Sequence, residues 1–91
     1  MIYEFNDKKY NNEQEIIHDG VQVIYYYCYV VKGRWMDIEC LMIEDGWYGF
    51  LYARDVICGR YDQDIEVLYL MRHSRKWADW YIDELVRYGN V

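Results

Sequence analysis

Apolar runs along the chain predict strands in its first two thirds. Residues 21–31 are almost wholly Val, Ile and Tyr, and such β-branched and aromatic runs are typical of strands. Both faces of this run are apolar, which indicates a central strand covered on both sides. In residues 35–43 an apolar set alternates with Asp37 and Glu39, as in a strand with one buried face.

Turn signals connect these runs into a meander. Residues 32–34, Lys-Gly-Arg, predict a hairpin loop of two or three residues, and the two lengths give different registers. Asp45-Gly46 favours a type I′ turn, so residues 47–52 are expected to return as a third strand. Residues 2–5 and 65–71 are predicted as further strands.

Helix signals are confined to two places. Asn12 is placed to cap a short helical turn over residues 13–17. Ser74 is the predicted cap of a terminal helix over residues 75–88, with Gly89 past its end. Together with the strands, these signals predict a single α+β domain over residues 1–91. Its architecture would be an antiparallel β-meander of four to five strands packed against one C-terminal α-helix.

One short segment resembles part of a known fold. Residues 46–56 read Gly-Trp-Tyr-Gly-Phe-Leu-Tyr-Ala-Arg-Asp-Val. This segment resembles the closing part of SH3-like small barrels, where an aromatic strand enters a short 3₁₀ turn before the last strand. The resemblance implies a curled, five-stranded sheet and a peptide-binding function.

The acidic balance of the chain favours a protein partner over nucleic acid. Sixteen carboxylates against ten Lys and Arg give a formal charge of −6, which opposes binding to phosphates and to anionic membranes. Twelve Tyr and four Trp supply rings of the kind that interfaces favour. Trp80 falls outside the apolar stripe of the last helix and is a candidate anchor. The predicted partner-binding residues are Asp37, Glu39, Glu44, Asp45, Trp47, Asp62, Asp64, Glu66 and Trp80.

The motifs of catalysis and metal binding are missing from the sequence. His18 and His73 stand apart from cysteines and carboxylates at metal-ligand spacing, and the glycines form no phosphate-binding loop. We therefore expect no enzyme, no cofactor and no metal. The three cysteines form no CxxC pair, and the chain opens with no signal-peptide pattern, which predicts a reduced cytoplasmic protein.

These observations favour a small acidic protein that binds a larger basic protein. A concrete version is an inhibitor that masks a nucleic-acid-binding site, with carboxylates in place of phosphates, as small phage anti-defence proteins of the anti-CRISPR type do. The link to those proteins is by size and composition alone. The alternatives are a homo-oligomeric structural or assembly protein, as a homodimer for example, and an SH3-like peptide-binding module.

Overall fold

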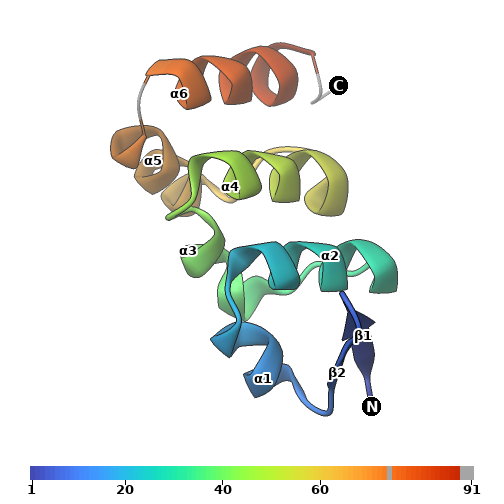
Figure 1. Cartoon of the computed structure of the whole chain (residues 1–91). Coiled ribbons are helices and arrows are strands. Elements are labelled where there is room, and N and C mark those ends of the chain that lie inside the picture. The colour runs from blue at the N-terminus through green and yellow to red at the C-terminus, as the bar shows by residue number, and fades with distance from the viewer. Residues whose placement is uncertain (74, 89–91) are drawn as a thin grey trace.

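Helices make up most of the computed structural model, which describes residues 1–73 and 75–88 (Figure 1). The strands are β1 (Tyr3–Phe5) and β2 (Lys8–Tyr10). The α-helices are α1 (Glu13–His18), α2 (Val21–Val31), α3 (Glu39–Met42), α4 (Gly46–Tyr52), α5 (Gln63–Arg72) and α6 (Arg75–Tyr81). A 3₁₀ turn, η1 (Met36–Ile38), precedes α3, and the π-helical segments η2 (Ala53–Ile57) and η3 (Ile82–Tyr88) extend α4 and α6.

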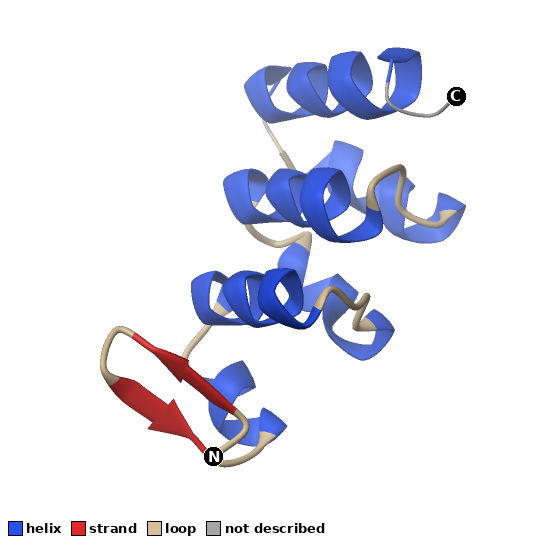
Figure 2. Cartoon of the chain, turned by 90° about the vertical axis from the view of Figure 1, so that its right-hand side faces the viewer, coloured by secondary structure: helices blue, strands red, loops and turns tan. Residues whose placement is uncertain are grey.

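The helices pair into three hairpins that stack on one another. α1 packs on α2, α3 on α4, and α5 on α6. α2, α4 and α6 lie side by side and form one layer of the stack (Figures 1 and 2). The molecule is accordingly elongated, with extents of 39 × 25 × 21 Å. Stacked helical hairpins of this kind are the architecture of α-solenoids, in which each unit buries its apolar face against its neighbours.

A two-stranded hairpin covers the N-terminal end of the stack (Figure 2). β1 and β2 pair antiparallel, with Tyr3 opposite Tyr10. Asn6 and Asp7 join them with φ values of 52° and 65°, the two positive angles of a type I′ turn. Both tyrosines are buried, and Tyr3 packs edge-on against Tyr27 of α2 at 5.3 Å between ring centroids. The hairpin thus extends the core beyond the first helices.

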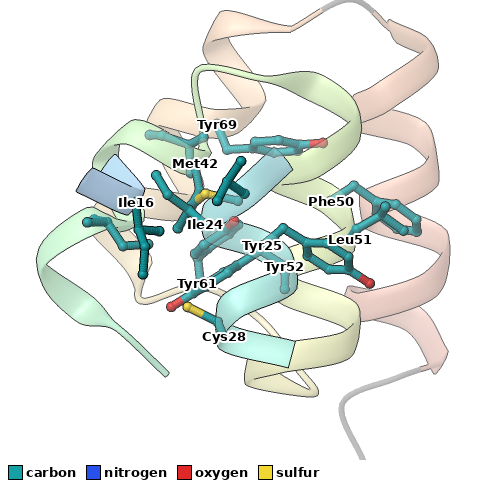
Figure 3. Close-up of a cluster of buried hydrophobic side chains, with 14 of the residues drawn as sticks. Ile16, Ile24, Tyr25, Cys28, Met42, Phe50, Leu51, Tyr52, Tyr61 and Tyr69 are labelled. Atoms are coloured by element: carbon teal, nitrogen blue, oxygen red, sulfur yellow. The ribbon is translucent and has the colours of Figure 1, made fainter. Parts of the chain in front are cut away.

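Tyrosine rings run through the centre of the core (Figure 3). Tyr61 lies 6.1 Å from both Tyr52 and Tyr69, measured between ring centroids. The hydroxyl of Tyr61 donates to the carbonyl of Gly49 at 2.6 Å, and that of Tyr69 to the carbonyl of Gly46 at 2.7 Å. Each buried phenol therefore has a partner, and the rings fill the space between hairpins at no cost in unpaired polar groups.

One polar network joins the first hairpin to the second. Arg34, in the loop after α2, donates from Nε and a terminal nitrogen to both carboxylate oxygens of Glu39, at 2.5 and 2.8 Å. Tyr52 of α4 donates to the same carboxylate at 2.9 Å. The hydroxyl of Tyr52 in turn accepts from the backbone N–H of Trp35 at 2.8 Å. Glu39 is 2% exposed, so its charge is stabilised by these partners rather than by water.

The same network occurs again between the second and third hairpins. Arg60 donates through the same two kinds of nitrogen to both oxygens of Glu66. Tyr81 of α6 donates to Glu66 at 2.6 Å and accepts from the backbone N–H of Tyr61 at 3.0 Å. The hydrogen bonds from Arg60 hold the pKa of Glu66 below its ordinary value despite burial. We call each network an Arg–Glu–Tyr latch, and each one ties a loop to the two helices of the next hairpin.

The predicted β-meander is wrong. The four later predicted strands, over residues 21–31, 35–43, 47–52 and 65–71, are helices α2, η1 with α3, α4, and α5. The SH3-like segment falls in α4 and η2 and forms no part of a barrel. The antiparallel sheet is limited to the β1–β2 pair in the described residues.

For residues 21–31 and 47–52, the reason for this error is that the runs are almost wholly apolar. A run that is apolar at every position fits the period of a strand and of a helix equally well. In α2 the buried set includes Val23, Ile24 and Cys28, which is the spacing of a helix face. Packing against α4 therefore overrides the β-propensity of Val and Tyr.

Three local predictions are confirmed. Residues 3–5 of the expected first strand form β1. Asn12 caps α1, since its side chain accepts from the backbone N–H of Glu15 at 3.0 Å. The terminal helix is present as α6 and η3. The predicted cap Ser74 and the terminating Gly89 lie outside the described residues.

Replacement of Gly49 by Ala should destabilise the stack. A Cβ at Gly49 would lie 2.8 Å from the carbonyl oxygen of Met42 and 2.9 Å from Cε2 of Tyr69. Overpacking of this kind costs about 2 kcal/mol in the free energy of unfolding, which urea denaturation followed by circular dichroism measures. Gly59→Ala is the matched control, because a Cβ there meets no atom within 4 Å. Equal stability of the two variants would contradict this packing.

Candidate functional site

A groove opens between the outer faces of α4 and α6. Its cavity has a volume of about 400 Å³. It is lined by Trp47, Phe50, Arg54, Trp80, Asp83 and Glu84. Helical spacing brings these side chains together, because residues three, four and seven apart share one face of a helix.

Three aromatic rings form the apolar part of the groove. Trp47 and Trp80 are 38% and 42% exposed, whereas Phe50 is buried. The ring centroids lie 5.8 Å apart for the two tryptophans, and Phe50 lies 6.2 Å from Trp47 and 6.0 Å from Trp80. The groove therefore has two half-exposed indole walls above a buried phenyl floor.

A fourth ring, Trp77, packs against both indole walls. It lies 5.8 Å from Trp47 and 5.5 Å from Trp80, with the second pair edge-to-face. A Cβ at Gly46 would lie 2.5 Å from Cδ1 of Trp77, so the indole occupies the space that a side chain at position 46 would need. Gly46 thus permits the close contact of α4 with α6.

A neutralised arginine occupies one end of the groove. The guanidinium of Arg54 lies 5.5 Å from the ring centroid of Phe50. Its nitrogens donate to both oxygens of Asp55 at 2.9 and 3.0 Å, and Tyr25 donates to Asp55 at 2.6 Å. Burial would raise the pKa of Asp55, but the hydrogen bonds from Arg54 and Tyr25 outweigh it and lower that pKa. The charge of Arg54 is therefore balanced inside the molecule.

Two carboxylates at the rim leave the groove acidic. Asp83 forms an ion pair with Arg87 at 3.2 Å, but both side chains are more than half exposed and such pairs are weak. Glu84 makes no ion pair within residues 1–73 and 75–88. The rim therefore presents negative charge beside the exposed indoles.

A lysine from α6 already lies against the faces of these rings. The ammonium of Lys76 is 4.7 Å from the ring centroid of Trp77 and 5.5 Å from that of Trp80. These distances are those of cation–π contacts. The indole cluster is thus placed to attract a positive charge.

The structure brings together two of the nine predicted partner-binding residues. Trp47 and Trp80, which are far apart in the sequence, meet in the groove through the packing of α4 on α6. The predicted partner-binding residues did not include Asp83 and Glu84, although their spacing of three and four from Trp80 on a predicted helix was a usable signal. Phe50 was missed because its segment was expected to be a strand.

The seven predicted carboxylates lie outside the groove, where they form buried hydrogen-bond networks, cap a helix or face solvent. Glu39 and Glu66 are buried in the two latches. Asp45 caps α4 by accepting from the backbone N–H of Tyr48 at 2.7 Å. The others are exposed or partly paired: Glu44 lies 3.5 Å from Arg72, Asp62 lies 3.3 Å from Arg34, and Asp37 and Asp64 are exposed.

Within the described ranges, no three side chains of the metal-ligating types come together. None of the described helices has the length and apolarity that crossing a membrane requires. Comparison with protein-family models, curated proteins and solved structures finds no match to this chain.

The two tryptophans of α6 should differ in how much stability they provide. Trp80→Ala removes a half-exposed ring and should cost about 1 kcal/mol in the free energy of unfolding. Trp77→Ala empties the space above Gly46 and should lower the free energy of unfolding by about 2 kcal/mol. This is about half of the loss when a fully buried aromatic ring is replaced by alanine. Urea denaturation of both variants measures the difference. A larger loss for Trp80→Ala would show that the groove is not formed by this packing.

Proposed function

We propose that this chain is a non-enzymatic binding protein that holds a basic segment of a partner protein in the groove between α4 and α6. The observation that supports this proposal most strongly is the presence of two half-exposed indoles, Trp47 and Trp80, in a cavity whose rim bears Asp83 and Glu84. Tryptophan is among the residues that are enriched at the hot spots of protein interfaces. Carboxylates beside them select a positively charged partner.

The charge of the whole chain supports the same partner. The formal charge of −6 creates a negative field that speeds encounter with a basic surface. Exposed carboxylates away from the groove, such as Asp37 and Asp64, contribute to this field. The groove would supply the specific contact, and the net charge the attraction at longer range.

One form of this function is an inhibitor that masks the basic nucleic-acid-binding site of a larger protein. Sites that bind nucleic acid carry the clustered Lys and Arg that an acidic groove would recognise. In that form, the partner would bind either this chain or its nucleic acid. Duplex DNA or RNA added to the complex would then release the partner.

Affinity capture with matched variants tests the proposal. Wild-type protein, the double variant Trp47→Ala/Trp80→Ala and the control Tyr29→Ala are immobilised and exposed to a cytosolic extract. Tyr29 is a suitable control because it is an exposed ring on α2, away from the groove. A basic protein should be retained by wild type and control and lost with the double variant.

The purified partner then gives a quantitative readout. Its Kd for the wild-type protein should weaken about tenfold or more between low and high salt, because the Debye length falls from about 30 Å at 0.01 M to about 3 Å at 1 M. Capture that is unchanged in the double variant would overturn the groove as the site. A Kd that is independent of salt would overturn the electrostatic part of the proposal.

A further inference from the structure

We infer that the groove recognises the side chain of an arginine, whose guanidinium would stack on the indole of Trp80, contact that of Trp47 and donate to Glu84. This inference rests on the proposed function and names the chemical group that the groove selects. It rests on the room in the cavity, on the cations that the rings already contact and on the carboxylates of the rim.

The cavity has room for one long side chain. At about 400 Å³ it is near the lower end of the range for ligand pockets. The floor is Phe50, which is buried, so the occupant enters between the two indole walls. A single extended side chain with an apolar stem satisfies these walls, and both Lys and Arg have such a stem.

The internal contacts indicate that the ring faces accept cations. Arg54 places its guanidinium over Phe50 at 5.5 Å, so a planar cation already fits beside this floor. Lys76 places its ammonium over Trp77 and Trp80. Arg54 is paired with Asp55 through two hydrogen bonds, so its interaction with the rim carboxylate of Glu84 is the weaker of the two.

The combination of rings and carboxylates favours arginine over lysine. A guanidinium is planar, so it stacks on an indole while its edge donates two parallel N–H groups to one carboxylate. The ammonium of lysine is compact and strongly hydrated, and it loses more hydration on entering an aromatic groove. Trp47 and Trp80 meet at 67°, so a cation stacked on one ring faces the other at an angle.

Lys76 lies on the ring that the arginine would contact. An incoming guanidinium would compete with the ammonium of Lys76 for the face of Trp80. Removing that ammonium should therefore tighten binding, whereas removing the charge of Glu84 should weaken it. A general loss of folding would produce weaker binding in both cases, so the opposite signs separate recognition from instability.

Short blocked peptides provide the test. Gly-Arg-Gly, Gly-Lys-Gly and Gly-citrulline-Gly are titrated into the protein, and the indole N–H signals of its four tryptophans are followed by NMR. The arginine peptide should shift the signals of Trp47 and Trp80. The signal of Trp35, which packs against Tyr27 away from the groove, should not change. The lysine peptide should bind several-fold more weakly, and the neutral citrulline peptide should not bind.

Variants then assign the contacts. Trp80→Ala should weaken the arginine peptide about tenfold or more. Glu84→Gln should weaken it about fivefold, and Lys76→Met should tighten it. Asp64→Asn and Lys9→Met, at exposed positions elsewhere in the fold, are the matched controls and should change nothing.

The outcomes distinguish this inference from the proposed function. Equal binding of the arginine and lysine peptides, or equal shifts at Trp35, would overturn the inference. If the groove variants still fail to capture a partner in that case, the proposed function stands without it. Selective binding of the arginine peptide in the absence of any captured partner would support arginine recognition and count against a protein partner for this groove.

Discussion

The structure depends on a buried carboxylate that is held by an arginine and a tyrosine between each hairpin and the next. Glu39 and Glu66 would each be costly to bury alone, and their ionised forms are stabilised because both oxygens accept hydrogen bonds. The tyrosine of each latch also accepts from the backbone after the arginine, so the loop, the first helix and the second helix are fixed at one point. Such a junction determines where α4 and α6 lie relative to the preceding hairpin.

The groove is a consequence of that placement. Tyr52, from the first latch, lies two residues after Phe50 on α4, and Tyr81, from the second, directly follows Trp80 on α6. The latches therefore hold the backbone that carries both walls and the floor. The surface aromatic rings can remain half exposed because the stability of the stack comes from the tyrosine core and the latches beneath them. Binding residues on a rigid support lose little conformational entropy when a partner arrives.

Local signals in the sequence predicted the helix caps and one exposed ring. They did not predict which segments pair as helical hairpins. Caps such as Asn12 depend on neighbours in the chain, so they were predictable, and the exposure of Trp80 followed from the helix around it. The helical state of residues 21–31 and 47–52 depends on packing between hairpins, which a uniformly apolar run does not encode. A Gly-Arg-aromatic motif occurs at residues 33–35 and 59–61, with a glutamate four residues after the first and five after the second, and this is a sequence signal of the repeated network. Without it, Glu39 and Glu66 read as surface acids rather than as latch residues.

A double-mutant cycle on the second latch tests this account most directly. Glu66→Ala and Tyr81→Phe are made singly and together, and the free energy of unfolding of each protein is measured by urea denaturation. If the latch joins the hairpins, each single variant loses about 1–3 kcal/mol. The double variant should then lose less than the sum, with a coupling energy of about 1 kcal/mol or more. Losses that add to within about 0.3 kcal/mol would show that the two side chains act independently, and would contradict the latch as the junction of the fold.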